Sequence, residues 1–152
     1  MKLTYRTARE EDLPKLVVML ADDQLGSTRE DPTAPLNTGY LSAFQSIDSD
    51  PNNELVVVSI DSQIVGMLQL TFIPYLTYIG SWRCLVEGVR IHSQYRGGGL
   101  GKHVLEYAID RAQQRNCHLV QLTSDKKRSD AIRFYISLGF TASHEGFKLH
   151  LK

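Results

Sequence analysis

Hydrophobic positions near the start of the chain predict a strand and then a helix. Residues 2–6 alternate in character, as a strand does. Apolar residues then recur at the i, i+3, i+4 and i+7 spacing of an amphipathic helix, at Leu13, Leu16, Val17 and Leu20. Thr7 and Glu10 have the spacing of a capping box just before this helix.

Three apolar, β-branched runs in the middle of the chain predict strands, at 54–60, 64–73 and 84–91. Residues 61–63, Asp-Ser-Gln, form a turn-like break between the first two. We expect a meander of antiparallel strands.

The last third of the chain predicts two helices and further strands. One apolar helix face of about four turns runs through Leu100, Val104, Leu105, Ala108, Ile109 and Ala112. Residues 118–124 read as a strand, and a short helix fits Ala131, Phe134, Tyr135 and Leu138, ending at Gly139. A last strand pair is expected in 140–151. The order of elements is that of a mixed α/β protein.

The connection 21–53 is long and rich in polar residues, proline and glycine. A weak helical pattern is present at Tyr40, Leu41, Phe44 and Ile47. Connections of this length in a compact domain are usually functional or mobile.

Composition favours one compact domain, residues 1–152. The chain has 152 residues, 42% of them hydrophobic, and its 17 Lys and Arg balance 17 Asp and Glu. A neutral chain has no net field to attract nucleic acid or an anionic membrane, so we expect neither as a partner.

The scattered histidines and the two cysteines, Cys84 and Cys117, lack the spacing of a metal or redox site, so we expect no metal and two unreactive thiols. The chain begins without the apolar segment of a signal peptide, and no apolar run is long enough to span a membrane. We therefore expect a cytoplasmic protein.

Three consecutive glycines, Gly97–Gly99, stand between the strand 84–91 and the helix from Leu100. Such a loop presents unpaired N–H groups and the positive end of a helix dipole to one point, which suits a phosphate. Arg96 and Lys102 would add positive charge. The alternative is a glycine-rich turn that merely caps the helix. Neither a Walker loop nor the dinucleotide-binding glycine pattern fits these residues.

The pattern that does fit is R-x-x-G-x-G at 96–101, between a strand and a helix. Here the sequence resembles the GNAT superfamily of N-acetyltransferases, in which this element holds the pyrophosphate of acetyl-CoA. Residues 130–140, DAIRFYISLGF, resemble that family's A-x-x-F-Y-x-x-L-G-F element, and residues 5–16 resemble its first strand and helix.

The resemblance implies an α/β (α+β) fold with a mixed, mostly antiparallel sheet, flanked by about four helices. The sheet would be splayed between its fourth and fifth strands, 84–91 and 118–124, with the pantetheine arm of acetyl-CoA in the gap. Acetyl-CoA would be the acyl donor, with no metal involved.

The same resemblance implies the cofactor contacts. The backbone of Val89, Arg90 and Ile91 would pair with the pantetheine, and the pyrophosphate would lie on Arg96, Gly97, Gly98, Gly99, Leu100, Gly101 and Lys102. The second motif would contribute Ala131 and Phe134. Arg128 stands where relatives often have Asn, so it would either reach the cofactor's phosphates or belong to a solvated basic turn.

Two residues are candidates for proton transfer. Tyr135 matches the family's frequent general acid, and a phenol can protonate a departing thiolate; the alternative is a core tyrosine on a helix. Glu87, in an apolar strand, could accept the amine's proton with a raised pKa. It could instead pair with Arg83 or Arg90, or face outward.

The predicted function is direct transfer of acetyl to a primary amine of a small molecule or peptide, without an acetyl-cysteine step. The acidic connection 21–53 would favour a cationic amine, or is simply solvated. A group of aromatic residues could line an acceptor pocket or a homodimer contact: Phe72, Tyr75, Tyr78 and Trp82. The alternative function is a non-catalytic module that binds or senses acyl-CoA.

Overall fold

The computed structural model describes residues 2–152. The chain divides into two compact units, Met1–Gln121 and Leu122–Lys152. The first holds a sheet with most of the helices, and the second holds one helix and the C-terminal segment.

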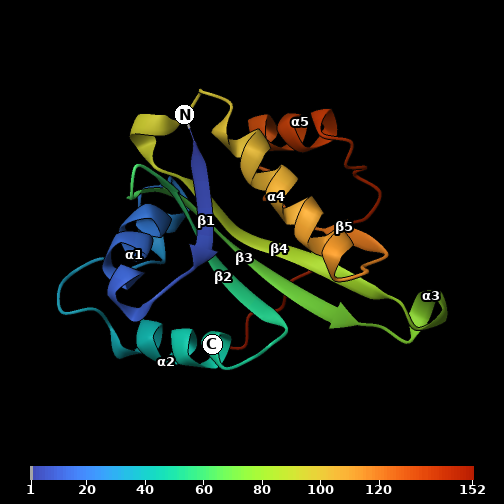
Figure 1. Ribbon diagram of the computed structural model, residues 1–152, viewed down its shortest axis with the longest axis horizontal. Coiled ribbons are helices and arrows are strands. Elements are labelled where there is room, and N and C mark those ends of the chain that lie inside the picture. The colour runs from blue at the N-terminus through green and yellow to red at the C-terminus, as the bar shows by residue number, and fades with distance from the viewer. Residues whose placement is uncertain (1) are drawn as a thin grey trace. The chain divides into compact units, whose positions relative to one another are not determined.

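The first unit is built on a five-stranded sheet in the order β1-β2-β3-β4-β5 (Figure 1). Its strands are β1 (Leu3–Thr7), β2 (Asn53–Ile60), β3 (Gln63–Pro74), β4 (Trp82–Ile91) and β5 (Leu119–Gln121). The first three pairings are antiparallel, and β5 joins β4 in parallel. The predicted meander and the mixed sheet are confirmed.

The helices of the first unit are α1 (Leu13–Ala21), α2 (Thr38–Asp48), the single turn α3 (Thr77–Gly80) and α4 (Leu100–Gln114). Short 3-10 turns cover Glu10–Asp12, Gly26–Thr28 and Ser93–Tyr95. The weak helical pattern in 21–53 therefore marks a real helix, α2.

The two faces of the sheet are covered by different helices (Figure 1). Because side chains alternate along a strand, Val56 and Val58 lie on one face and Val57 on the other. The face of Val57 packs on α1 and α2, through Leu13, Leu16, Met19 and Phe44. The opposite face meets α4, whose buried side chains are Leu100, Val104, Leu105, Ala108 and Ala112. The apolar faces predicted for α1 and α4 are thus confirmed.

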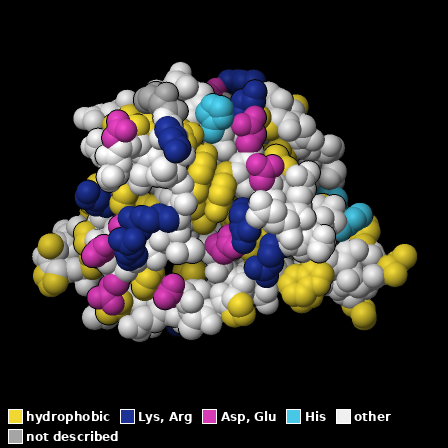
Figure 2. All heavy atoms as spheres, viewed as in Figure 1, with side chains coloured by type: hydrophobic (Ala, Val, Ile, Leu, Met, Phe, Trp, Pro, Cys, Tyr) yellow, Lys and Arg dark blue, Asp and Glu magenta, His cyan; other side chains and the backbone are white. Residues whose placement is uncertain are grey.

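Charges of both signs are interspersed on the face of the molecule shown in Figure 2, as the neutral composition suggests. Apolar side chains project from the surface at the right of Figure 2, where α3 lies in the same view in Figure 1. They belong to the β3–β4 hairpin, where Leu76 is 96% and Ile79 fully exposed.

The chain enters α1 through Asp12 rather than through the expected capping box of Thr7 and Glu10. Asp12 is buried, and its carboxylate accepts hydrogen bonds from both guanidinium ends of Arg6, at 2.8 and 3.0 Å, and from the backbone N–H of Arg9 at 2.7 Å. The Arg6 hydrogen bonds, with the N–H of Arg9, hold the pKa of Asp12 below its usual value. This ionised carboxylate ties β1 to the start of α1.

The second unit contains α5 (Ser129–Ser137), which ends near Gly139 in the left-handed conformation, as expected, with φ of 97°. The expected last strand pair is wrong for the single chain: residues 140–152 form neither helix nor strand. A strand exists only through hydrogen bonds to a neighbouring strand, and in the described chain none pairs with this segment.

We expect Asp12→Asn to destabilise the fold by about 1–3 kcal/mol at neutral pH, because it leaves the Arg6 charge without its anionic partner. Since the folded pKa of Asp12 lies below the unfolded one, the stabilisation is present above about pH 4 and is lost as the pH falls through the folded pKa. Urea unfolding at several pH values measures both effects.

The exposed Asp110 supplies the matched control. Asp110→Asn should change the free energy of unfolding by less than about 0.5 kcal/mol. A gap between wild type and Asp12→Asn that persists undiminished at pH 2 would contradict the role of the ionised carboxylate.

Candidate active site

The two edges of β4 have different partners. Along one edge, β3 pairs from Trp82 to Ile91, whereas along the other β5 pairs only with Arg83–Leu85. Beyond Leu85 no described strand adjoins this second edge. The predicted opening between the fourth and fifth strands is therefore present, and the backbone of residues 86–91 borders it.

A bulge lies in this open part of β4. Met67 pairs with Arg90 and Gln69 with Glu87, so Leu68 of β3 opposes two residues of β4, Gly88 and Val89. Gly88 has a φ of 61°, which a glycine adopts without steric cost. The bulge bends β4 just before Val89–Ile91, the backbone predicted to meet the pantetheine.

The glycine loop adopts a conformation that explains its glycines. Gly97 and Gly99 both have a φ of 82°, and Gly99 is the N-cap of α4. A Cβ placed on either glycine would meet no atom within 4 Å, so the backbone there borders open space. Gly99 has no side chain to cap α4, so no N-cap side chain satisfies the first N–H groups of the helix.

Of the two cations expected at this loop, Arg96 is engaged by the protein itself and Lys102 is exposed. Arg96 donates to the carbonyl of Ile91 at 3.0 Å and to that of Asp22 at 2.9 Å, and lies 3.6 Å from the Asp22 carboxylate. Lys102 is exposed, with its Nζ 4.0 Å from Glu106. Arg96 thus ties the loop to the end of α1, and Lys102 is the freer cation.

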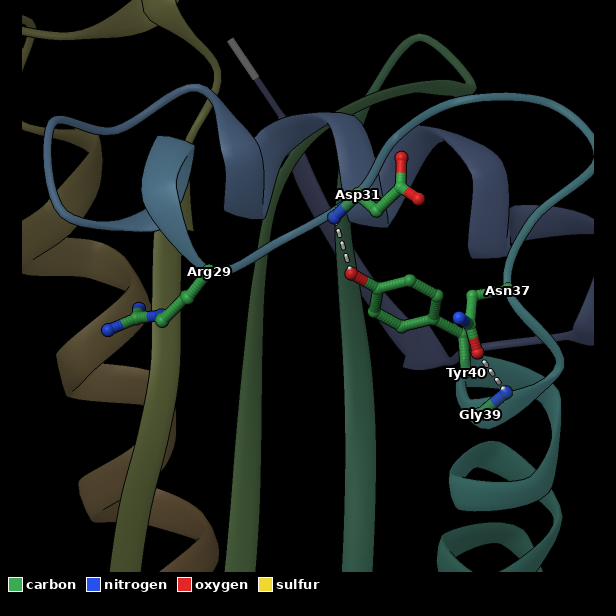
Figure 3. Close-up of a pocket in the computed structure, with 5 residues that line it drawn as sticks. All are labelled: Arg29, Asp31, Asn37, Gly39 and Tyr40. Carbon is green, nitrogen blue, oxygen red and sulfur yellow. Dashed lines mark hydrogen bonds between the residues drawn. The ribbon is translucent and has the colours of Figure 1, made fainter. Parts of the chain in front are cut away.

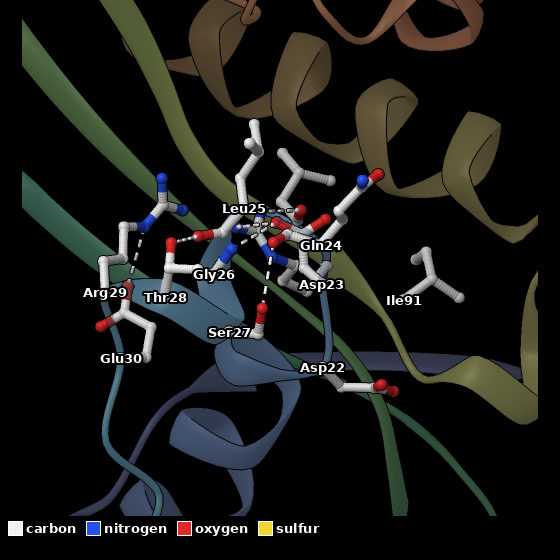
Figure 4. A network of polar contacts seen from close by, with 12 residues as sticks. Asp22, Asp23, Gln24, Leu25, Gly26, Ser27, Thr28, Arg29, Glu30 and Ile91 are labelled. Atoms are coloured by element: carbon white, nitrogen blue, oxygen red, sulfur yellow. Dashed lines mark hydrogen bonds and ion pairs between the residues drawn. The ribbon is translucent and has the colours of Figure 1, made fainter.

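The segment that follows α1 is folded on itself by polar contacts (Figure 4). The N–H of Gly26 donates to Asp23 at 3.1 Å, and Asp23 lies 3.6 Å from Arg90. Glu30 pairs with Arg29 at 3.2 Å. Because Asp22, Asp23 and Glu30 each face an arginine, this connection attracts cations less than its composition suggests.

A polar pocket of about 340 Å³ lies in the same connection, lined by Arg29, Asp31, Asn37, Gly39 and Tyr40 (Figure 3). The Tyr40 hydroxyl accepts from the N–H of Asp31 at 2.9 Å and donates to Glu30 at 3.0 Å. Hydrogen bonds from Thr33 lower the pKa of Asp31. The pocket shares no residue with the glycine loop.

Glu87 is exposed, so the apolar strand around it does not enclose its carboxylate. The outward-facing position that the sequence allowed is therefore the one observed. Gln69 lies directly across from it on β3.

The polar neighbours of Glu87 were missed by sequence reasoning. Asn53 accepts from Gln69 at 3.3 Å and from Thr71 at 2.7 Å, which forms a polar group on β2 and β3. The available signal was the polar residue at two alternate positions, 69 and 71, within an otherwise apolar strand.

The second motif forms helix α5 in the second unit. Tyr135 lies on this helix, half-buried, with its ring 5.4 Å from that of Phe134 and 6.0 Å from that of Phe140. Ala131 is also half-buried. Arg128 directly precedes the helix, in a turn where its N–H donates to the carbonyl of Asp125 at 2.9 Å.

The aromatic group of the β3–β4 hairpin is divided. Phe72 is buried, 1% exposed, with the Arg115 guanidinium 4.2 Å above its ring, so it is a core residue and not a pocket wall. Tyr75 and Tyr78 both stack on the Arg83 guanidinium, at 3.8 and 5.4 Å. Trp82 is partly exposed.

The cysteines are unsuited to nucleophilic catalysis. Burial raises the pKa of Cys84 to about 12, and burial also raises that of Cys117. Both are free thiols. Within residues 2–152, no cluster of three or more metal-ligating side chains is present, and no helix is long and apolar enough to cross a membrane.

Comparison with known proteins identifies the family. The model of the acetyltransferase (GNAT) family matches residues 19–140. An aminoalkylphosphonate N-acetyltransferase of Salmonella typhimurium is 30% identical over 108 residues, which cover 71% of this chain and 70% of that protein. The chain belongs to the GNAT acetyltransferase family.

Solved structures of GNAT proteins and their relatives share the fold. A protein of Bacillus halodurans C-125, described as a transcriptional regulator, is 56% identical, with a TM-score of 0.95 over 99% of this chain and 100% of that one. A predicted acetyltransferase of Clostridium acetobutylicum, solved with acetyl-CoA, has a TM-score of 0.73 at 21% identity, over 99% of this chain and 97% of that one.

Two neighbouring glycines of the loop differ in φ, so alanine substitutions at the two positions can be compared. We expect Gly99→Ala to destabilise the fold by about 1–2 kcal/mol, since an L residue is strained at positive φ. Gly98 does not have positive φ, and its added Cβ would meet only the Tyr95 carbonyl at 3.9 Å. Gly98→Ala should therefore stay within about 0.5 kcal/mol of wild type. Urea unfolding compares the two, and equal losses would contradict the left-handed assignment of Gly99.

Proposed function

We propose that this protein is a single-domain N-acetyltransferase that transfers the acetyl group of acetyl-CoA directly to a primary amine of a small molecule or peptide. The observation that carries the proposal is the open edge of β4 followed by the uncapped N-terminus of α4 at Gly99. The family model spans residues of both units, which supports one functional domain. The cytoplasmic location and the absence of a metal stay predictions.

Residues of the first unit are proposed to bind two parts of acetyl-CoA, the pantetheine and the pyrophosphate. The bulged backbone of Val89, Arg90 and Ile91 would bind the pantetheine by strand-like hydrogen bonds. The N–H groups of residues 96–101 would bind the pyrophosphate, where the helix dipole and Lys102 favour negative charge. An N–H of the bulge would donate to the thioester carbonyl and stabilise the charge that develops on its oxygen.

On α5, Ala131 and Phe134 are the proposed cofactor contacts and Tyr135 is the proposed general acid. Bound acetyl-CoA supplies the acetyl group as a thioester. As the amine nitrogen bonds to the carbonyl carbon and the C–S bond breaks, Tyr135 would give its phenolic proton to the departing sulfur. Arg128 would lie near the phosphates, in place of the asparagine frequent in the family.

Glu87 would accept the proton that the attacking amine loses, directly or through water. Its exposed position on the open part of β4 and the polar group of Asn53, Gln69 and Thr71 beside it favour a water-mediated transfer. The protonated thiols of Cys84 and Cys117 favour direct transfer over a covalent acetyl-enzyme.

The acceptor is proposed to be a small primary amine. The Salmonella relative is named for aminoalkylphosphonates, so these compounds open the substrate panel, followed by amino sugars, polyamines and peptides. The polar pocket of Arg29, Asp31 and Tyr40 is a candidate for binding the acceptor's polar groups.

A second candidate is a regulatory module that binds acyl-CoA without turnover. It is favoured by the 56% identical protein described as a transcriptional regulator. Acetyl-CoA binding with no product over the whole amine panel, together with a gel shift on DNA, would support this candidate over the enzyme.

Thermal unfolding with acetyl-CoA and amine turnover together test the proposal. Ligand at 100 times its Kd should add about 2.7 kcal/mol and raise the Tm by several degrees, and pyrophosphate should not reproduce the shift. Tyr135→Phe should keep the same shift but lower kcat by at least about 10-fold, since general acid catalysis contributes about 100-fold or more. No shift at millimolar acetyl-CoA would refute the cofactor site, and an unchanged kcat would remove Tyr135 from the reaction.

The proposed base is tested separately. Glu87→Gln keeps the size and hydrogen-bonding capacity of the side chain but cannot accept a proton, so we expect a lower kcat/KM and the loss of the acidic limb of its pH profile. Asp110→Asn, which changes an exposed carboxylate on α4 outside the proposed site, is the control. A pH profile of Glu87→Gln that overlays the wild type would contradict the role of base.

A further inference from the structure

A series of hydrogen bonds leads to the neighbourhood of Glu87 from Asp50, in the turn between α2 and β2. The Asp50 carboxylate accepts a hydrogen bond from Nδ2 of Asn53 at 2.8 Å. Oδ1 of Asn53 in turn accepts from Nε2 of Gln69 at 3.3 Å and from the hydroxyl of Thr71 at 2.7 Å. The four side chains of the series are half-buried. The series therefore ends on β3 at Gln69, the residue directly across from Glu87.

The series has a fixed direction, because a carboxylate can only accept hydrogen bonds. Asn53 must turn its NH2 group to Asp50 and its carbonyl oxygen to β3. That oxygen also only accepts, so Gln69 must present its own NH2 group to Asn53. The other half of the Gln69 amide, the carbonyl oxygen Oε1, then faces away from Asn53. Among residues 2–152, no protein group donates a hydrogen bond to this oxygen.

Gln69 and Glu87 are neighbours on one face of the sheet. Because they are directly opposite in the register of β3 and β4, their Cβ atoms are about 4.5–5.5 Å apart. The face is the one that packs on α1 and α2, since Val57 and Met67 on the same face belong to that core. Glu87 is exposed and lies two residues before Val89, where the backbone proposed to bind the cofactor begins. The two side chains thus offer hydrogen-bond acceptors next to the proposed reaction centre.

We propose that Gln69 is a specificity-determining residue, which accepts a hydrogen bond from the acceptor's nitrogen and so selects primary over secondary amines. This inference rests on the proposed function and adds a residue to it. A neutral primary amine has two N–H bonds besides the lone pair that attacks the thioester carbon. One N–H would donate toward Glu87, directly or through water, and the other to Oε1 of Gln69. A neutral secondary amine has only one N–H, so one of the two acceptors is left without a donor.

The fixed direction of the series is what makes Gln69 selective. A freely rotating amide can turn by 180° and present either a donor or an acceptor, so it does not distinguish an N–H group from an oxygen. Gln69 held by Asn53 presents only its oxygen to a ligand, and the Glu87 carboxylate beside it likewise favours a group that donates. The rotamer of Gln69 is already ordered before the amine binds, which reduces the entropic cost of binding.

Kinetics with two amines test the proposal: the best primary amine of the panel and its N-methyl analogue, each at saturating acetyl-CoA. Gln69→Met keeps the length of the side chain but removes the amide oxygen. We expect it to lower the ratio of kcat/KM for the primary amine to that for the N-methyl amine by about 5-fold or more, because only the primary amine can donate to both acceptors. A merely structural role would lower both values and leave the ratio unchanged.

Thr71→Val is the matched control. It removes the other donor to Asn53 but leaves the bond between Gln69 and Asn53 in place, so the ratio should stay at the wild-type value. Acetyl-CoA should raise the Tm of every variant as it does that of wild type, which verifies folding and cofactor binding. Turnover by wild type with the same ratio in Gln69→Met would overturn this inference alone, whereas a wild type that acetylates no amine would refute the proposed function as well.

Asn53→Leu tests the orientation of the amide separately. It keeps Gln69 but removes the group that holds it, so the amide can rotate and the preference for the primary amine should fall toward that of Gln69→Met. The thermal shift with acetyl-CoA should again be retained. A ratio that stays at the wild-type value in Asn53→Leu would contradict the fixed direction from which the role of Gln69 is inferred.

Discussion

The short parallel ladder between β4 and β5 is the constraint on which the functional parts of the first unit depend. Only three residues of each strand pair before the ladder ends at Leu85 and Gln121. Because a backbone edge must find hydrogen-bond partners, the early end of this ladder is what allows the proposed pairing of β4 with the cofactor. The bulge at Gly88 and the left-handed Gly97 and Gly99 then direct the chain into α4, so its first N–H groups follow directly after that open edge.

Much of this arrangement was predictable from residue patterns, since burial dictates them. The apolar runs of β2 and β3 and the apolar face of α4 indicated the correct elements, because each has only one way to place its hydrophobic residues inside. The place of the glycine loop before α4 was also predicted, since consecutive glycines before a helix are costly to order unless the backbone needs a positive φ or a close approach to a ligand, and Gly97 and Gly99 do have positive φ. The strand at 118–124 was expected but is shorter, at Leu119–Gln121, because pairing and not composition determines where a ladder ends.

The parts that the sequence misjudged depend on contacts between distant residues. The sequence left open whether Glu87 has apolar surroundings or faces outward. It is exposed, and only the register with Gln69 reveals its polar neighbours. Phe72 was a candidate for a pocket wall or a homodimer contact, but it is buried on β3 beneath the Arg115 guanidinium. The acidic connection after α1 was expected either to favour a cationic amine or to be solvated, whereas Arg90 and Arg96 lie against Asp23 and Asp22. Whether a strand residue is buried depends on which face of the sheet it occupies, and whether a carboxylate is paired depends on arginines from distant parts of the chain. Neither can be predicted from the local sequence.

The polar contacts of Arg96 also connect the two sides of the proposed reaction centre. Arg96 holds the carbonyls of Ile91 and Asp22, and Arg90 lies near Asp23, so the loop that would receive the cofactor and the segment that would receive the amine share one set of ion pairs. The buried state of Cys84 has a different, practical consequence. With both thiols of the chain protonated at neutral pH, colorimetric reagents that trap thiolates would respond to free CoA as it is released and scarcely to the protein itself, so turnover can be followed continuously without blocking or replacing a cysteine.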